Sequence, residues 1–303
     1  MIVPPKISDA ALRHLQEVAD RPDLSGTPYE VVEAIGRGGM GTVYLARDRD
    51  LEREVALKVV SLPEGDSAER LLREARILAR LEHPGIVPVH DVGTLPDGRV
   101  FYAMKRVRGK RLDEVARTAP LSERLRVLSR ICEAVAFAHA HGVIHRDLKP
   151  ENVMVGSFGE VLVMDWGVAK TLTASPEAHG TILGTPGYMA PEQERGEVER
   201  IDERTDVWAL GAILGFLLAG EEAPRPLAAI RQRAMAAEPA ERYPKVDELA
   251  ADLTRYLAGL SVGAYRESFL ESTVRFVRRY RTPILLVLAY LVMRALLLIF
   301  LGR

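Results

Sequence analysis

Short apolar stretches rich in β-branched and aromatic residues, separated by turn residues, fill the first third of the chain. Five such stretches are typical of β-strands, and they lie at residues 29–36, 41–48, 54–60, 86–95 and 99–107. The first three are expected to form an antiparallel meander. Residues 67–81 place Leu and Ala at helical spacing opposite charged residues, which predicts an amphipathic helix, and from Leu121 onward the pattern is mainly helical. The chain therefore predicts an α+β fold with a β-rich first part and a larger α-rich second part.

The two ends of the chain have patterns of their own. Residues 1–28 form an extension in which apolar residues recur at helical spacing after Ser8, so a short helix is expected over residues 8–20. Two prolines near the start interrupt the apolar run that a secretory signal needs, so export of the body of the chain by that route is not expected. At the other end a basic segment, residues 259–283, precedes an apolar run, residues 284–301.

Composition narrows the class of protein. With 303 residues, of which 48% are hydrophobic and 27% charged, the chain can form two domains or two lobes and is not a low-complexity or disordered sequence. Its single cysteine, Cys132, excludes an intrachain disulfide, and no Cys/His pair has zinc spacing, which indicates a reducing compartment. The formal net charge of -1 argues against a nucleic-acid partner.

A glycine-rich turn joins the first two expected strands. Gly36, Gly38 and Gly41 have the spacing GxGxxG, in which backbone N–H groups can approach phosphate oxygens because no Cβ stands in the way. A dinucleotide fold would continue from this turn into a helix, whereas a second strand follows here, which favours a hairpin over ATP phosphates. On its own the match also fits an ordinary glycine-rich turn.

Two charged residues follow the glycine-rich turn in a suggestive order. Lys58 ends an apolar strand, where an unpaired ammonium would be costly to desolvate. Glu74 lies in the amphipathic helix and can reach back to pair with it while the lysine also contacts the α- and β-phosphates of ATP. Taken singly, each residue could equally be a solvated surface charge.

The most specific motif is the uninterrupted run His-Arg-Asp-Leu-Lys-Pro-Glu-Asn at residues 145–152, followed by Asp-Trp-Gly at residues 165–167. With these motifs the sequence resembles the protein kinase family, specifically the bacterial eukaryotic-like (Hanks-type) serine/threonine kinases, from about Tyr29 to Leu257. The resemblance implies a two-lobed protein kinase fold. Its N-lobe would cover residues 29–106 and its C-lobe residues 107–258.

The resemblance also implies a role for each motif residue. Asp147 would orient the substrate hydroxyl and accept its proton, Lys149 would contact the transferring phosphate, and Asn152 and Asp165 would bind Mg²⁺, with Mn²⁺ as an alternative metal. Lys149 also favours Ser/Thr over Tyr substrates. The residues expected to bind ATP are Gly36, Arg37, Gly38, Gly39, Met40, Gly41, Val43, Ala56, Lys58, Met104, Lys105 and Val107.

Further residues are expected to support the site. Ala-Pro-Glu at residues 190–192 would end the activation segment, with Glu192 paired to Arg242, and Asp206 would anchor the backbone of the catalytic loop. Arg146 precedes Asp147, as in kinases that are switched on by phosphorylation of the activation segment. In that segment Thr181 is the expected phosphosite.

Thr185 is expected to present a structural or substrate-facing hydroxyl.

Two departures from the family pattern are visible. Trp166 stands where Phe is usual, and an aromatic side chain of either kind can fill an apolar slot. Between Gly220 and Arg242 one C-lobe helix that the family commonly has is absent, which bears on substrate docking. That absence supports an alternative function, a pseudokinase or ATP-binding scaffold. The retained Lys58 and the other motif residues argue against it, and a small-molecule phosphotransferase is a weaker third alternative.

The apolar run at residues 284–301 is near the lower length limit for a transmembrane helix and contains one charged residue, Arg294. The arginines before it favour a cytoplasmic kinase domain under the positive-inside rule. These features predict a single-pass protein of the cell membrane, with homodimerisation through Arg294 as a further expectation. The resemblance to protein kinases implies that it phosphorylates proteins. The alternative is a helix that packs on the C-lobe or lies in the membrane interface.

Overall fold

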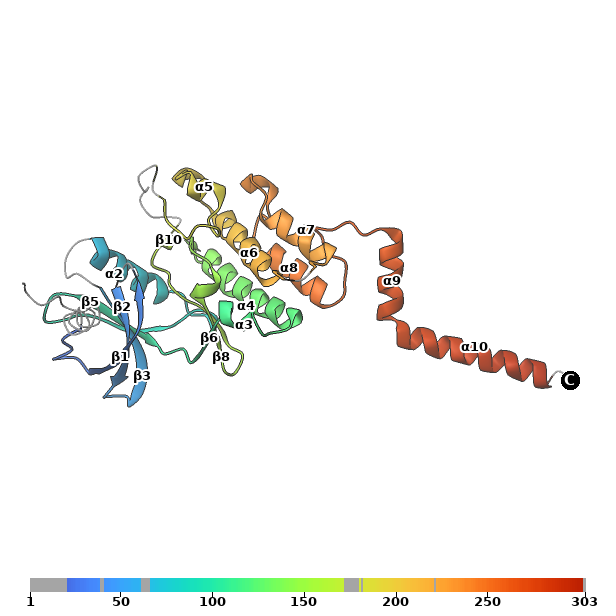
Figure 1. Cartoon of the computed structure of the whole chain (residues 1–303), viewed down its shortest axis with the longest axis horizontal. Coiled ribbons are helices and arrows are strands. Elements are labelled where there is room, and N and C mark those ends of the chain that lie inside the picture. The colour runs from blue at the N-terminus through green and yellow to red at the C-terminus, as the bar shows by residue number, and fades with distance from the viewer. Residues whose placement is uncertain are drawn as a thin grey trace, which may run out of the picture.

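The computed structural model describes residues 21–38, 41–60, 66–171, 180, 182–220 and 222–301. In this part of the chain a sheet-rich lobe precedes a helical lobe, and two further helices extend beyond the second lobe (Figure 1). The predicted α+β fold is confirmed. The helix predicted over residues 8–20, together with Gly39, Met40 and Thr181, lies outside the described residues.

The first lobe is built on a five-stranded antiparallel sheet with the order β1-β2-β3-β5-β4. Its strands are β1 (Tyr29–Gly38), β2 (Gly41–Asp48), β3 (Arg53–Val60), β4 (Val89–Thr94) and β5 (Val100–Lys105). The predicted meander of the first three strands is confirmed. The fourth strand is shorter than predicted because Pro88 has no N–H to donate to the sheet, and it lies at the edge with β5 next to β3.

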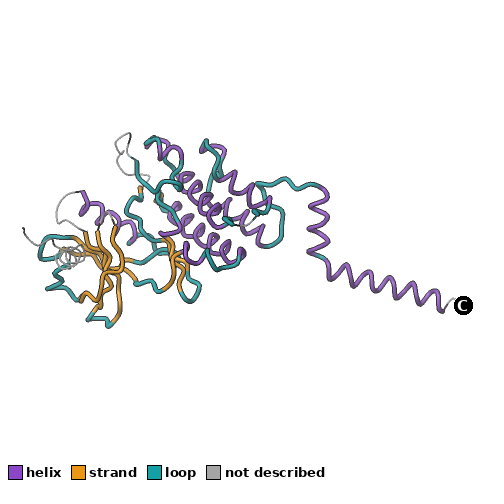
Figure 2. Tube along the Cα trace, in the orientation of Figure 1, coloured by secondary structure: helices purple, strands orange, loops and turns teal. Residues whose placement is uncertain are grey.

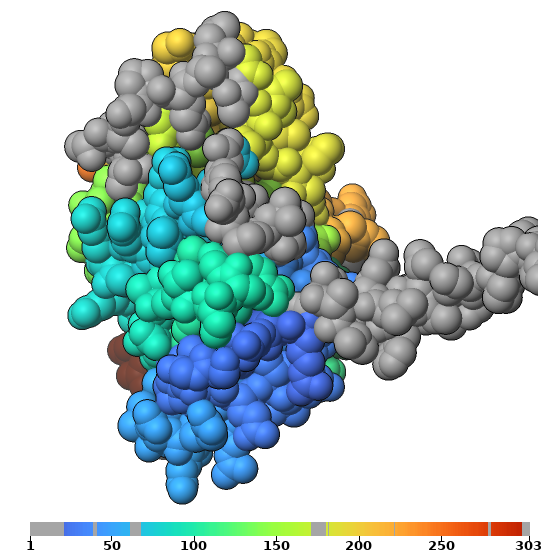
Figure 3. Space-filling view, turned by 90° about the vertical axis from the view of Figure 1, so that its left-hand side faces the viewer, coloured from blue at the N-terminus to red at the C-terminus, as the bar shows by residue number. Residues whose placement is uncertain are grey.

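Alternation along β3 separates the two faces of this sheet. Val55, Leu57 and Val59 belong to one apolar cluster, whereas Ala56 and Val60 belong to the main core, which continues into the helical lobe. Side chains on a strand alternate between faces, so Lys58 points to the same side as Ala56 and Val60. Helix α2 (Asp66–Leu78) packs beside β4 and β5, as the cyan and green surfaces of Figure 3 show.

The second lobe is mainly helical, as predicted. Its helices are α3 (Leu112–Val115), α4 (Leu121–Ala140), α5 (Pro191–Glu194), α6 (Glu203–Leu217), α7 (Arg225–Ala234) and α8 (Val246–Leu257), with 3-10 turns at η1 (Pro150–Asn152), η2 (Val198–Arg200) and η3 (Pro239–Glu241). Helix α4 packs against α6 and α8 around a core of Leu128, Ile131 and Leu210, all fully buried.

Short strands lie where the helical lobe meets the first lobe (Figure 2). The strands β6 (Gly109–Arg111), β8 (Val153–Gly156) and β9 (Val161–Val163) form one small sheet, and β7 (Val143–Ile144) pairs with β10 (Lys170–Thr171). These strands have only two to four residues each, which is too short for a period to show in the sequence. These strands flank the run at residues 145–152 and hold it between the lobes.

The connection from α6 to α7 is short. Among the described residues between α6 and α8, α7 is the single α-helix, in line with the helix expected to be absent from this interval. Helix α7 instead packs directly on α6 at Gly211. The approach is so close that a Cβ added at Gly211 would lie 2.8 Å from the Ala234 Cβ and 2.7 Å from the Met235 Cγ. The glycine allows this close approach.

The chain after α8 is fastened to the helical lobe before it leaves. The buried carboxylate of Asp252 accepts hydrogen bonds from the backbone N–H groups of Gly263 (2.7 Å) and Ala264 (3.0 Å) and from the Tyr243 hydroxyl (2.9 Å). Beyond this point α9 (Phe269–Arg279) and α10 (Arg281–Leu301) project away from the lobes (Figure 1).

Candidate active site

Lys58 on β3 connects the two lobes. Its ammonium Nζ lies 2.9 and 2.8 Å from the two carboxylate oxygens of Glu74 on α2 and 3.0 Å from Oδ1 of Asp165, which follows β9. The predicted pairing of Lys58 with Glu74 is confirmed. A fully buried Tyr102 completes this group, because its hydroxyl donates to Glu74 Oε1 at 2.9 Å.

Burial and the neighbouring charges act in opposite directions within this group, and at Glu74 burial prevails and raises the pKa of the carboxyl above its usual value. Burial alone would lower the pKa of the Lys58 ammonium, but the carboxylates of Glu74 and Asp165 outweigh burial and raise that pKa above its usual value. Burial acts to raise the pKa of Asp165, yet Lys58 holds this carboxyl below its usual pKa. Lys58 is therefore cationic and Asp165 ionised at neutral pH, and half of the Asp165 side chain remains exposed toward the space between the lobes.

The predicted catalytic residues of the run at residues 145–152 converge on one carboxylate. Asp147 Oδ2 accepts hydrogen bonds from the Lys149 ammonium (3.1 Å) and the Asn152 amide (3.2 Å), and Oδ1 accepts one from the Thr185 hydroxyl (2.7 Å). The Lys149 ammonium also donates to Thr185 Oγ1 at 2.6 Å. Asp147 is thus held by donors on two sides and stays partly accessible.

Asp206 on α6 fixes the backbone that carries Asp147. Its fully buried carboxylate accepts hydrogen bonds from the backbone N–H groups of His145 (2.8 Å) and Arg146 (2.9 Å), and the His139 ring lies 2.7 Å away. Arg146 adopts a left-handed backbone with φ of 67°, which a non-glycine residue adopts at a cost. The anchoring predicted for Asp206 is confirmed and holds this strained turn in place.

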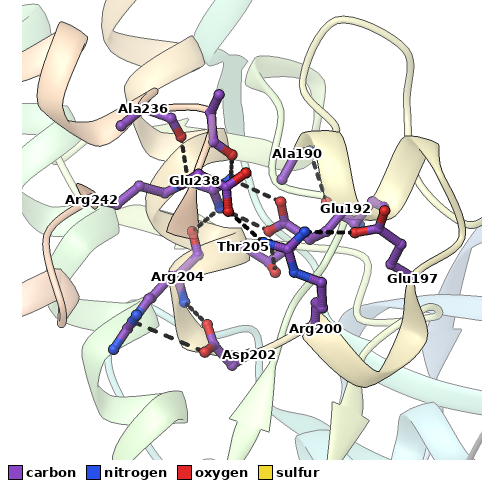
Figure 4. Close-up of polar contacts among 12 residues, drawn as sticks. Ala190, Glu192, Glu197, Arg200, Asp202, Arg204, Thr205, Ala236, Glu238 and Arg242 are labelled. Carbon is purple, nitrogen blue, oxygen red and sulfur yellow. Dashed lines mark hydrogen bonds and ion pairs between the residues drawn. The ribbon is translucent and has the colours of Figure 1, made fainter. Parts of the chain in front are cut away.

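A second buried ion pair, between Glu192 and Arg242, supports the end of the activation segment. Glu192 on α5 accepts two hydrogen bonds from the Arg242 guanidinium, at 2.7 and 2.8 Å, and one from the Thr205 hydroxyl at 3.0 Å (Figure 4). Arg242 also donates to the backbone oxygens of Ala236 and Arg204. The predicted pair is confirmed, and each nitrogen of the Arg242 guanidinium has an acceptor, which offsets the cost of burying the charge.

The residues expected to contact ATP lie on the side of the five-stranded sheet to which Lys58 points and in the segment after β5. Gly36 pairs with Val43 across β1 and β2, Val43 pairs with Lys58, and Ala56 pairs with Met104. Ala56 and Met104 are buried. Val43 and Val107 are half-buried, and Gly36, Arg37, Gly38 and Lys105 are exposed.

Gly41 explains one glycine of the turn directly. A Cβ at this position would lie 2.1 Å from the Val59 carbonyl oxygen, so no other residue fits between β2 and β3 without displacing the sheet.

Asn152 and Asp165 are suited to a divalent metal. The Asn152 amide nitrogen donates to both the backbone oxygen (2.9 Å) and Oδ2 of Asp147, so the amide oxygen remains as the atom that can act as a ligand. The backbone N–H of Met164, next to Asp165, donates to the Asn152 carbonyl oxygen at 2.8 Å and ties the two segments together. An amide oxygen and an ionised carboxylate are hard donors of the kind that Mg²⁺ prefers.

Two site residues were missed by the sequence analysis. Tyr102 lies opposite Lys58 in the pairing of β3 with β5. The register of these two strands, had it been known, would have placed a tyrosine beside the buried lysine and pointed to it. Gln193 donates to the backbone oxygens of Arg146 (2.8 Å) and Leu183 (3.2 Å) and joins α5 to the activation segment. The sequence carries no pattern that marks a buried glutamine as such a bridge.

A β-rich lobe and a helical lobe, joined through Lys58 and enclosing the Asp147 loop, define the two-lobed protein kinase fold. The chain belongs to the protein kinase domain family, whose sequence model matches residues 29–260.

Several curated relatives share this domain. The chain is 33% identical over 299 residues to the serine/threonine-protein kinase PknD of Protochlamydia amoebophila (strain UWE25), an alignment that covers 77% of this chain and 30% of the relative. It is 35% identical over 326 residues to PknD of Chlamydia muridarum, covering 85% of this chain and 34% of the relative. For PknD of Chlamydia trachomatis serovar D the identity is 36% over 299 residues, covering 76% and 32%. The chain therefore spans about a third of the length of the curated relatives it matches.

Proposed function

We propose that this chain is a serine/threonine protein kinase of the bacterial Hanks type, which transfers the γ-phosphate of ATP to hydroxyl groups of proteins, including its own. The observation that carries the proposal is the contact of Lys58 with both Glu74 and Asp165, because it places the cation, the α2 carboxylate and the predicted metal ligand within one hydrogen-bonded group. The relatives named as serine/threonine-protein kinases support the same activity.

Each residue of the site has a role that follows from its surroundings. Lys58, held by Glu74, presents its charge to the α- and β-phosphates, and the backbone of the glycine-rich turn covers them. Asp147 orients the attacking hydroxyl and takes up its proton. Lys149 lies beside Asp147 and neutralises charge that develops on the transferring phosphate.

Asn152 and Asp165 are the proposed metal ligands. Mg²⁺, or Mn²⁺ in its place, held by these two residues would neutralise charge on the phosphate groups. The chain prepares for this by keeping Asp165 ionised, since a carboxylate must be deprotonated to act as a ligand.

The decisive experiment is a phosphotransfer assay on the purified full chain in detergent, with Mg·ATP and a generic Ser/Thr protein substrate. Incorporation of phosphate on Ser or Thr that is lost on chelation of the metal and in the Asp165→Asn variant supports the proposal. Arg195→Ala serves as the matched control, because Arg195 forms an exposed pair with Glu197 away from the site. Binding of ATP without turnover in the wild type would contradict the proposal and leave a scaffold function.

The membrane part of the proposal rests on α10. Within the described residues, the window Arg281–Leu298 is long and apolar enough to cross a bilayer, and none of it is buried against the lobes. We place the kinase domain on the cytoplasmic side because basic residues precede this helix. Resistance of the full chain to carbonate extraction tests the anchor. Crosslinking in membranes that weakens in the Arg294→Leu variant tests a homodimer, and unchanged crosslinking would contradict it.

Phosphorylation of the activation segment completes the proposal. Thr181 is the proposed phosphosite, and Arg146, next to Asp147, is buried and already donates from Nε to the Val168 carbonyl oxygen at 2.6 Å. Mass spectrometry after incubation with ATP should find phosphate on Thr181, and the Thr181→Ala variant should then have reduced activity. Full activity in that variant would contradict this role.

A further inference from the structure

Helix α9 carries its apolar side chains along one side, and they face solvent. The exposed fractions are 86% for Phe269, 76% for Leu270, 66% for Val274, 57% for Phe276 and 49% for Val277. At helical spacing these positions fall within one continuous arc. The rings of Phe276 and Tyr280 contact each other on this arc, with centroids 4.7 Å apart.

The polar side of α9 is the side that makes ion pairs. Glu271 pairs with Arg225 of α7 at 3.1 Å, and Arg275 pairs with Glu267 at 2.7 Å. Ser268 and Glu271 form a capping box at the start of the helix, which fixes where α9 begins. A helix of a soluble domain turns its apolar side inward and its polar side outward. Helix α9 does the reverse with respect to α7, so its apolar side is directed toward something other than the kinase domain.

Charge and continuity indicate what that occupant is. The α9 sequence contains three arginines and one glutamate, and a fourth arginine, Arg281, begins α10. Helix α10 follows α9 after Tyr280, and Figure 1 shows α9 lying across the direction of α10 rather than continuing it. A helix with one aromatic and aliphatic side and a polar side that includes Arg275, set across a spanning helix, has the form of a helix that lies in the plane of a membrane surface.

We propose that the apolar side of α9 (Phe269, Leu270, Val274, Phe276, Val277 and Tyr280) inserts into the interface of a bilayer that contains anionic phospholipids. Arg275 on the opposite side would lie at the level of the headgroups, where an arginine contributes a factor of about five in binding to an anionic surface. This inference rests on the membrane part of the proposed function but not on the catalytic part, so the two can fail separately. A second copy of the chain is the competing occupant.

The test measures the depth of single labels in the full chain, reconstituted in vesicles of phosphatidylcholine with phosphatidylglycerol. Cys132 is fully buried and does not compete for a thiol-reactive fluorophore. One label goes on the apolar side of α9 (Val274→Cys), one on its polar side (Ser272→Cys) and one at the middle of α10 (Leu291→Cys). Lipids brominated on their acyl chains quench a label only where it reaches the hydrocarbon.

The proposal expects quenching and blue-shifted emission for the Val274→Cys label, little of either for the Ser272→Cys label, and weaker quenching at Val274→Cys in phosphatidylcholine alone. Adding Val277→Asp should abolish quenching at Val274→Cys, whereas adding Thr254→Asp, on α8, should not.

Three results would overturn the proposal. Quenching at Leu291→Cys with none at Val274→Cys would show that α10 spans while α9 stays in water. Absence of quenching at all three labels would reject the membrane part of the proposed function as well, and phosphotransfer would be unaffected. Blue-shifted emission at Val274→Cys that is independent of brominated lipid and rises with protein density would assign the face to a second copy.

Discussion

The Thr185 hydroxyl donates a hydrogen bond to Oδ1 of Asp147 at 2.7 Å and accepts one from Lys149 at 2.6 Å. A residue of the activation segment thus holds the carboxylate proposed to receive the substrate proton, at the oxygen that Lys149 and Asn152 do not contact. The position of the activation segment and the orientation of Asp147 are therefore linked through one side chain.

Replacing Thr185 should reduce catalysis without unfolding the protein. In Thr185→Val the hydrogen bond to a charged acceptor is lost, and kcat should fall about 10- to 100-fold, since such a bond contributes roughly 1.5–3 kcal/mol. Thr185→Ser keeps the hydroxyl and should restore most of the activity. Initial rates with a Ser/Thr substrate measure both. Loss of activity in Thr185→Ser with none in Thr185→Val would show that the methyl group, and not the hydroxyl, is what matters.

Removing one partner of the ion pair between Glu192 and Arg242 should strongly destabilise the fold. Because both side chains are buried, Glu192→Ala or Arg242→Ala leaves an uncompensated charge and should cost about 3–5 kcal/mol of the free energy of unfolding. The exposed pair of Arg195 and Glu197 provides the comparison, where Arg195→Ala should cost less than about 1 kcal/mol.

Denaturant unfolding followed by tryptophan fluorescence measures these differences. The double variant Glu192→Leu with Arg242→Leu should lose less than the sum of the two single variants, because no buried charge remains. Strictly additive losses would argue that the pair is not coupled.

Trp166 should tolerate replacement by the family's usual residue. Its ring is fully buried, packs 4.5 Å from the His145 ring, and donates from Nε1 to the Val163 carbonyl oxygen at 3.3 Å. Trp166→Phe loses this long hydrogen bond and some volume, so we expect a loss of about 1 kcal/mol in stability and activity within a few-fold of the wild type. Trp166→Ala opens a cavity and should cost about 3–5 kcal/mol. Loss of activity in Trp166→Phe with an unchanged melting temperature would point to a direct role for the indole.

Stability should fall on acidification. Burial acts to raise the pKa of both Asp206 and Glu192. At Asp206 it is outweighed by the His139 ring and the backbone N–H of His145, and at Glu192 by the Arg242 guanidinium, so both pKa values are lowered. Below about pH 5 the unfolded chain then binds more protons than the folded chain, so the free energy of unfolding decreases as pH falls through about 4.

Melting temperatures measured from neutral pH to about pH 4 test this sign. The drop should be smaller in Glu192→Gln than in the wild type, although that variant starts from a lower melting temperature at neutral pH. A melting temperature that is constant or rises toward acid would contradict the assignment.

The sequence was sufficient for the parts of this molecule that repeat or that carry charge in a fixed order. The strands around Val43, Ala56 and Met104 were predictable from their alternation, and the pair of Lys58 with Glu74 from its order after the glycine-rich turn. The pair of Glu192 with Arg242 was implied by the resemblance to protein kinases.

Other features depend on distance in space and leave no periodic trace. The place of β5 between β3 and β4 follows from which edges are free once three strands have paired. The contact of Gln193 with Leu183 joins two backbone segments whose nearness depends on the folded activation segment. The reversed orientation of α9 became visible only when the ion pair of Glu271 with Arg225 showed which side faces α7.

The hydrogen bonds of Asp252 to Gly263 and Ala264 limit the distance between the helical lobe and α9. Only residues 265–268 remain between that anchorage and α9, and four residues span at most about 14 Å. With α10 in a bilayer, as proposed, so short a connection would limit how far the catalytic loop can move from the lipid surface. A substrate that shares the membrane would meet the kinase at a frequency set by its density in two dimensions, whereas a freely diffusing protein would have to approach the surface first.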